Sequence, residues 1–226
     1  MRQYVVATPS QELRLQTLRN TYLLLALSML PTALGALIGV GLSFSFIAGS
    51  PILGSLILMG ALYFLMFMVQ KNKDSFAGIV WMMLFTFVMG ALLGPLLQFA
   101  LRLPNGSSLV LMAALLTGVV FAVMSALAFS LKRELSSLNS FLAIGGIVIM
   151  VAVVVNIFMQ LPVLHLVLCG AFVIFSSLMI LWQLNQIVMG GESNYIVATL
   201  SIYVSLYNLF TSILQLLIAF SGGDRR

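Results

Sequence analysis

Charged residues are scarce in this sequence, which has only 10 Lys or Arg and 5 Asp or Glu among 226 residues, against 62% hydrophobic residues. So few polar side chains cannot cover a water-soluble globule, and the composition predicts an integral membrane protein. The net charge of +5 would favour nucleic-acid binding only if the basic residues lined one face. They are scattered between apolar runs, so we exclude nucleic acid as a partner and expect the lipid bilayer to surround most side chains.

Cysteine and histidine occur only once each, as Cys169 and His165. A single cysteine excludes a disulfide framework within the chain. The two residues stand four positions apart, a spacing that could hold two ligands of a metal ion, but no other His or Cys exists to complete a site. We therefore expect Cys169 to be a packed core thiol, and His165 and Asn156 to be buried polar residues, with no metal or cofactor bound.

Catalytic motifs are absent as well. A serine nucleophile needs a base to activate it, and the lone histidine has no Gly-x-Ser-x-Gly segment to act on; HExxH and pairs of intramembrane acids are also missing. We expect the protein not to be an enzyme.

The charged residues cut the chain into five uncharged stretches of 51, 27, 29, 57 and 31 residues. Spanning the hydrocarbon takes about 20 residues, so the two longest stretches can each hold two helices. Both carry a break where one is needed, at Gly49-Ser50-Pro51 and at Gln160-Leu161-Pro162. The sequence thus predicts an all-α bundle of seven transmembrane helices, over residues 21–47, 52–70, 76–101, 108–130, 138–159, 162–182 and 196–220.

No long linker divides the chain, so we expect one transmembrane domain over residues 21–220, with a cytoplasmic tail over 1–20 and a short tail over 221–226. The apolar stretch after Arg19 is too long for a cleavable signal peptide, so the first helix should stay in the membrane. Pro9 interrupts any continuous helix in the N-terminal tail, and part of this tail should be mobile.

Basic residues predict the orientation, because Lys and Arg in short loops stay on the cytoplasmic side of a membrane. Seven of the ten fall on one side of the seven-helix scheme: Arg2, Arg14, Arg19, Lys71, Lys73, Lys132 and Arg133. The N-terminus should therefore be cytoplasmic and the C-terminus periplasmic. The loop from Asn185 to Asn194 has no Lys or Arg, so a re-entrant seventh segment with a cytoplasmic C-terminus is the alternative.

Small residues are spaced for close helix packing in two GxxxG motifs, Gly35 with Gly39 and Gly90 with Gly94. Pro95 follows the second motif and predicts a kink or the end of a turn. A hinge or a pore constriction is the functional alternative to packing.

A polar stripe follows one face of the seventh segment, at spacings of four, three, four and three residues. Such a stripe is unsuited to lipid and should turn inward, either as hydrogen-bonding contacts between helices, which we favour, or as the lining of a wet cavity. Its members are Ser201, Ser205, Asn208, Ser212 and Gln215.

Four segments resemble the Bax inhibitor-1 family, and most closely its bacterial YccA-type branch. They are Leu18 to Tyr22, Gly94-Pro95, Val155 to His165, and Gly190 to Phe210. The resemblance covers nearly the whole chain. It implies a seven-helix fold with the C-terminal helix packed centrally inside the bundle.

The resemblance also implies two functions. Some family members are pH-sensitive calcium leak channels whose sensor is a pair of aspartates in the sixth and seventh helices. At the matching positions this chain has Gln183 and Ser205. It also has no arginine between Arg19 and Arg102, so the arginine that can pair with such acids is missing. A neutral pair cannot titrate, and it is a poor ligand for a hard cation.

The bacterial branch instead binds FtsH, a membrane-anchored ATP-dependent protease, and restrains its degradation of other membrane proteins. We therefore expect a non-enzymatic inner-membrane modulator of an FtsH-type protease, gripped by its N-terminal tail. A cation leak channel with a degenerate sensor is the alternative.

Overall fold

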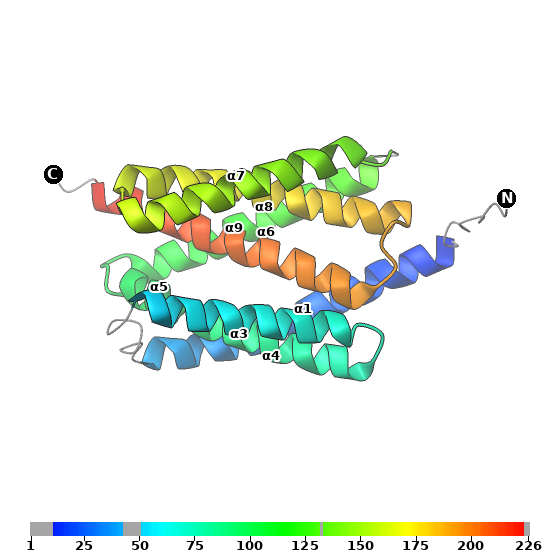
Figure 1. Cartoon of the computed structure of the whole chain (residues 1–226), viewed down its shortest axis with the longest axis horizontal. Helices are drawn as coiled ribbons and strands as arrows, with labels where there is room; N and C mark the ends of the chain where they lie inside the picture. Colours follow the sequence, from blue (N-terminus) through cyan, green and yellow to red (C-terminus); the bar gives the residue numbers. More distant parts are fainter. Residues whose placement is uncertain (1–10, 43–50, 132, 224–226) are drawn as a thin grey trace.

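The computed structural model describes residues 11–42, 51–131 and 133–223, and every regular element in these ranges is an α-helix. The helices lie lengthwise beside one another (Figure 1). Their bounds are α1 Gln11–Gly41, α3 Pro51–Lys71, α4 Phe76–Leu92, α5 Gly94–Leu101, α6 Gly106–Ser130, α7 Ser136–Met159, α8 Pro162–Met189 and α9 Tyr195–Gly223.

The C-terminal helix α9 occupies the middle of the bundle. It contacts α1, α3, α4, α6 and α8, and its Ile202, Leu209 and Leu214 are fully buried. The outer helices turn apolar side chains outward; on α7, for example, Ile144, Ile147 and Val151 are exposed. Apolar residues on the outside of a helical bundle suit lipid as the surroundings.

Among the residues that the structure describes, six helical segments are long and apolar enough to cross a membrane. They are Gln11–Gly41, Phe76–Leu101, Gly106–Ser130, Leu138–Met159, Pro162–Met189 and Tyr195–Ser221. The predicted second span corresponds to α3, in which the stretch Leu56–Lys71 is apolar but shorter than these six segments. The all-helical prediction is confirmed, while the count of seven crossings stays a prediction.

The predicted breaks between adjacent spans depend on proline. Gln160 ends α7 in the left-handed conformation (φ 50°), and Pro162 begins α8. Gly49 and Ser50 of the other break lie outside the described residues, and Pro51 is the first residue of α3. In the predicted third span, Leu93 separates α4 from α5, and Pro95 stands in the first turn of α5.

Two predicted boundaries need correction, because polar residues near the membrane surface do not stop a helix. Helix α1 begins at Gln11, ten residues before the predicted first span, so residues 11–20 of the predicted tail are helical. Helix α8 continues to Met189, seven residues past its predicted end at 182. The connection to α9 therefore shortens to residues 190–194, and α9 runs unbroken from Tyr195 to Gly223.

The two GxxxG motifs pack against each other where α1 meets α4 and the start of α5. A Cβ added at Gly35 would collide with the carbonyl oxygen of Phe87, and one at Gly90 with that of Thr32. A Cβ at Gly94 would collide with the carbonyl oxygen of Gly39 itself. The motifs therefore let two backbones touch, which is the packing role expected of them.

Candidate functional site

The two positions that the resemblance matches to the family's acid pair are both buried and neutral. Gln183 on α8 and Ser205 on α9 are each 5% exposed. The Ser205 hydroxyl donates to the carbonyl oxygen of Ser201, one turn earlier, at 2.9 Å. The Gln183 amide has no hydrogen bond to the part of the chain that the structure describes. These positions supply neither a titrating group nor an anionic ligand.

The polar stripe of α9 turns inward along its whole length. Ser205 and Ser212 are buried, and Ser201, Asn208 and Gln215 are half-buried. Where a stripe side chain donates a hydrogen bond, the acceptor is in α9 itself; Gln215 Nε2, for example, donates to the Thr211 carbonyl oxygen at 3.1 Å. Within the described residues, the hydrogen bonds of the stripe stay inside α9, while its C-terminal half lines a cavity. Which of the two roles the stripe serves, contacts between helices or the lining of a wet cavity, stays a prediction.

That cavity lies between α7, α8 and α9 and has a volume of about 280 Å³. The C-terminal half of the stripe lines it with Asn208, Ser212 and Gln215. Asn156 on α7 lines it from the other side, with a buried side-chain oxygen that has no hydrogen-bond partner. Amides and hydroxyls that converge in a cavity of this size can hold water or a small polar molecule.

His165 and Cys169 line the same cavity from α8, one turn apart. The Cys169 sulfur lies 3.8 Å from His165 Nε2, and Cys169 is buried as predicted. His165 is exposed, however, which corrects the prediction of a buried histidine. It stands in the first turn of α8. The described residues contain no group of three or more His, Cys, Asp or Glu that could hold a metal ion.

Tyr203, a residue that the sequence reasoning did not single out, makes hydrogen bonds that join helices in the interior. Its side chain is 2% exposed and its hydroxyl lies 2.8 Å from Thr32 Oγ1 on α1. It also donates to the carbonyl oxygen of Thr86 on α4 at 3.3 Å. The ring packs edge-on against Phe85, with ring centres 6.0 Å apart. Tyr203 thus ties α9 to α1 and α4.

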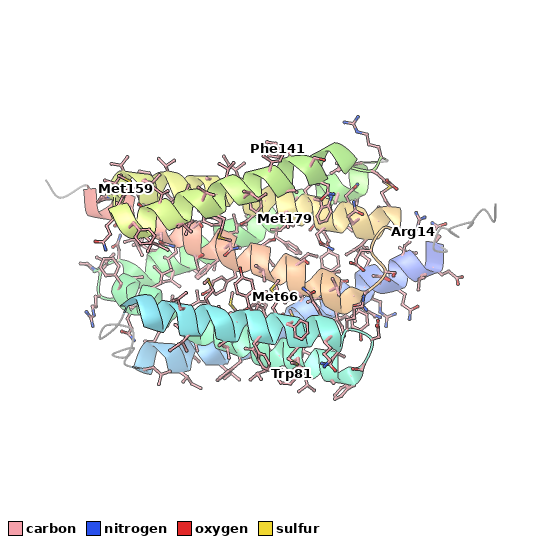
Figure 2. All side chains as sticks on the ribbon, viewed as in Figure 1. Arg14, Met66, Trp81, Phe141, Met159 and Met179 are labelled. Atoms are coloured by element: carbon pink, nitrogen blue, oxygen red, sulfur yellow. The ribbon has the colours of Figure 1, made fainter. Side chains whose placement is uncertain are left out.

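At the end of the bundle where α1 begins, the α8–α9 loop is held by the N-terminal helix. Gly190 ends α8 with a φ of 83°, a left-handed conformation that suits glycine. Arg14 lies against this glycine and donates from NH1 to the Val188 carbonyl oxygen at 3.5 Å. Its positive charge suits the negative end of the helix dipole of α8. Figure 2 shows Arg14 beside the loop, and Thr17 Oγ1 donates to the Ser193 carbonyl oxygen at 3.2 Å.

Two asparagines hold the neighbouring loops at the same end. Asn185, fully buried, accepts from the Leu135 backbone N–H and donates to the Arg133 carbonyl oxygen, both at 3.2 Å. Asn194 caps α9 by accepting from the Ile196 N–H at 3.0 Å, and it donates to Asp74 Oδ1 at 2.8 Å. Sequence reasoning placed both residues in a loop. Asparagine just before an apolar helix is a capping signal, which would have identified Asn194.

Known proteins resemble this chain over nearly its whole length. Residues 14–222 match the family described as inhibitor of apoptosis-promoting Bax1. The chain is 38% identical over 202 residues, 89% of each protein, to an Escherichia coli K12 protein named "Modulator of FtsH protease YccA". It is 41% identical over 209 residues, 92% of each protein, to an uncharacterized protein of Neisseria meningitidis serogroup B. The chain therefore belongs to the Bax inhibitor-1 family.

Proposed function

We propose that this chain is a non-enzymatic protein of the bacterial inner membrane that binds an FtsH-type, membrane-anchored, ATP-dependent protease and modulates it. The observation that carries the proposal is the similarity, over 89% of both proteins, to the E. coli relative named as a modulator of FtsH. A second E. coli relative is named "Inner membrane protein YccA", which supports the location. The N-terminus is cytoplasmic in this proposal, as the Lys and Arg distribution predicts.

The packing supports a mechanism of inhibition that needs no catalytic group. A processive protease starts at a free chain end and must then pull helices out of the membrane. Extracting α1 would break the contacts of Gly35 and Gly39 with α4 and α5, and the Thr32–Tyr203 hydrogen bond. It would also expose backbone groups that only the helix satisfies. A protein that is held by its tail but yields slowly occupies the protease and spares other substrates.

Only the part of the tail that precedes α1 can serve as the end at which the protease begins to pull. Residues 11–20 belong to α1, and Arg14 and Thr17 attach it to the α8–α9 loop. We infer that residues 1–10 are the first part gripped. The contacts of Arg14 and Thr17 then form the first barrier to pulling.

Co-purification from native membranes tests the proposal. The chain, tagged after Arg226, would be expressed with a proteolytically inactive FtsH-type protease that holds its substrates. We expect the protease to be recovered with the chain and not with an unrelated membrane protein that carries the same tag. We also expect slower breakdown of a second membrane substrate by the active protease. No recovery together with unchanged breakdown would exclude the proposal.

A cation leak is the second candidate, and one observation favours it. The cavity between α7, α8 and α9 carries amides and hydroxyls, including the unpartnered Asn156 oxygen, and could admit water. Among the described residues, the buried polar side chains are all neutral, as Gln183, Asn185 and Thr199 illustrate. A bare calcium ion would lose its hydration there without gaining an anionic ligand.

Calcium flux into dye-loaded liposomes separates the two candidates. With Gln183 and Ser205 at the sensor positions, we expect no calcium flux that switches with pH. The double variant Gln183→Asp with Ser205→Asp tests whether a pair of acids is enough to produce pH-dependent calcium flux. A buried acid pair without an arginine partner can also destabilise the bundle. A pH-gated calcium leak in the unmodified protein would overturn our interpretation of this site.

A further inference from the structure

The cavity between α7, α8 and α9 begins near the turn that joins α7 to α8. Asn156 lines it from the last turn of α7, and His165 lines it from the first turn of α8. His165 is exposed, and so is Gln160 in the turn itself. Figure 2 shows Met159, the last residue of α7, at the same end of the bundle as the end of α9. Helix ends of a transmembrane bundle lie near the membrane surface, so the cavity begins at a level that water reaches.

From this end the cavity reaches into the membrane for about two helical turns. Seven residues separate His165 from Phe172 on α8, and seven separate Gln215 from Asn208 on α9; all four line the cavity. At a rise of about 1.5 Å per residue this is about 10 Å, or about a third of a hydrocarbon core about 30 Å thick. Beyond Asn208 the adjoining cavity is lined mainly by apolar residues, Met150 among them. The polar part is therefore a vestibule that ends inside the bundle.

Polar groups in the vestibule lack hydrogen-bond partners in the protein. The side-chain amide of Asn208 and the hydroxyl of Ser212 line it, make no hydrogen bond to the described residues and keep some accessible surface. Gln215 donates from Nε2 to the Thr211 carbonyl oxygen, so its Oε1 is left to accept. Each unpaired group would cost free energy in hydrocarbon, whereas water can both donate to and accept from such groups. At about 30 Å³ for one water molecule, the 280 Å³ of the cavity holds several.

The lining of the vestibule favours uncharged molecules. Among the described residues that form it, none is Asp, Glu, Lys or Arg. Neutral amides and hydroxyls can replace the water around an uncharged polar molecule, but they compensate poorly for the hydration that an ion loses. The class of molecule that fits is therefore small and uncharged, with groups that both donate and accept hydrogen bonds. Water itself belongs to this class.

We propose that this cavity is a water-filled vestibule, open at the α7–α8 turn, that admits small uncharged polar molecules as far as Cys169 and Asn208. Cys169 lines it one turn further in than His165, with its sulfur 3.8 Å from His165 Nε2. Because Cys169 is the chain's only cysteine, its thiol reports which solutes enter. The vestibule is independent of any protease contact and of the neutral sensor positions, and it differs from a cation leak because it excludes ions.

The native thiol and a thiol on the outer face of the same helix provide a matched test. Val167 on α8 is 61% exposed and stands nearer the helix end than Cys169, so depth does not favour Cys169. The probe is 2-hydroxyethyl methanethiosulfonate, a small neutral reagent. It reacts with the thiolate, which forms in water and hardly in hydrocarbon, and it leaves a mixed disulfide and a sulfinate.

The reaction rates are compared in proteoliposomes. We expect Cys169 to react more than about tenfold faster than the thiol of Val167→Cys in a Cys169→Ala background, because a tenfold ratio is only a small part of the cost of placing an anion in hydrocarbon. Protein unfolded in sodium dodecyl sulfate shows that both thiols can react. Equal rates in the bilayer, or reaction of Cys169 only after unfolding, would overturn the proposal.

Charged reagents test the exclusion of ions on the unmodified protein. Relative to their rates with free cysteine in water, the trimethylammonioethyl and sulfonatoethyl reagents should react with Cys169 more than about tenfold slower than the neutral one. Equal relative rates would mean that ions enter as well, contrary to the proposal.

The place of the vestibule is tested by filling it. Ser212→Leu puts an apolar side chain into the cavity and should largely abolish the reaction of Cys169 with the neutral reagent. Ser130→Leu makes the same change at an exposed position of α6 and should leave the rate unchanged. An unchanged rate in Ser212→Leu would mean that solutes reach Cys169 by another route, and it would overturn the proposed site.

Discussion

The side chain of Arg14 lies directly against Gly190, so that a Cβ added to the glycine would stand 2.7 Å from Arg14 Nε. This contact joins the first helix to the loop that opens the last one. A larger residue at position 190 would push the Arg14 side chain aside, and the positive φ of 83° favours glycine there. The N-terminal part of α1 is thus attached to the end of α8.

The first prediction uses this attachment to test the tail mechanism. Deleting residues 2–9 should lengthen the protein's lifetime in cells that contain the protease, because it removes the starting end and leaves Arg14 and Thr17 in place. Arg14→Ala should shorten the lifetime, because it frees the start of α1 from Val188 and Gly190. Pulse-chase labelling measures both effects, and a strain without the protease is the control. Equal, protease-dependent lifetimes for all three forms would contradict the mechanism.

The second prediction concerns the glycines of the α1–α4 contact. Gly90→Ala forces a methyl group against the Thr32 carbonyl oxygen and should destabilise the bundle by about 1–3 kcal/mol or more, the usual cost of overpacking. Gly118→Ala on α6 is the matched control, because nothing lies within 4 Å of a Cβ there. Thermal or denaturant unfolding in detergent measures the difference. An equal loss of unfolding free energy in both variants would mean that the close backbone contact at Gly90 does not stabilise the bundle.

These glycines show what sequence can and cannot establish. The GxxxG spacing predicted close packing, because small residues at that spacing let helices touch. It could not say that Gly39 meets Gly94, since many pairings of two such motifs fit the same pattern. The inward turn of Ser205 and Ser212 was predictable from their unsuitability to lipid. Their lack of interhelical hydrogen bonds was not, because a serine in a helix can always donate to its own preceding turn.

The third prediction concerns the hydroxyl of Tyr203. Tyr203→Phe removes its hydrogen bonds to Thr32 and Thr86 but leaves Thr32 bonded to the Ser28 carbonyl oxygen, so the loss should be modest, about 0.5–1.5 kcal/mol. Tyr203→Ala also opens a cavity and should cost about 3–5 kcal/mol. Unfolding in detergent measures both changes. If the Phe variant is as unstable as the Ala variant, the hydroxyl matters more than the ring, contrary to this prediction.

Long-range polar contacts are the other part of the site that sequence could not supply. Asn185 and Asn194 were assigned to a loop because amides follow the apolar run, yet Asn185 is in a helix and Asn194 caps the next one. Their partners, Leu135 and Asp74, are 50 and 120 residues away. No local pattern specifies such pairs. The predicted start of α1 is wrong for a related reason, since Arg19 bounds the uncharged run without ending the helix, which continues back to Gln11.

The fourth prediction concerns the orientation in the membrane. A reporter fused after Arg226 should read as periplasmic, and one inserted between Lys71 and Lys73 as cytoplasmic. Helix α1 begins and α9 ends at opposite ends of the bundle, and the unbroken helix Tyr195–Gly223 favours a full crossing over a re-entrant seventh segment (Figure 1). Alkaline phosphatase and green fluorescent protein fusions provide the two readings. A cytoplasmic reading at both positions would contradict the seven-crossing arrangement.

The central place of α9 has a consequence for how the protein is made. Translation proceeds from the N-terminus, so the helix that contacts α1, α3, α4, α6 and α8 leaves the ribosome last. Until then Thr32 has no hydrogen bond to Tyr203 and Phe85 has no ring contact with it, because α9 has not yet joined the earlier helices. A chain that stops before Tyr195 therefore lacks the part of the core that α9 supplies, which includes Ile202, Leu209 and Leu214. Each molecule therefore passes through a state at the membrane in which the first helices are present and the central helix α9 is not.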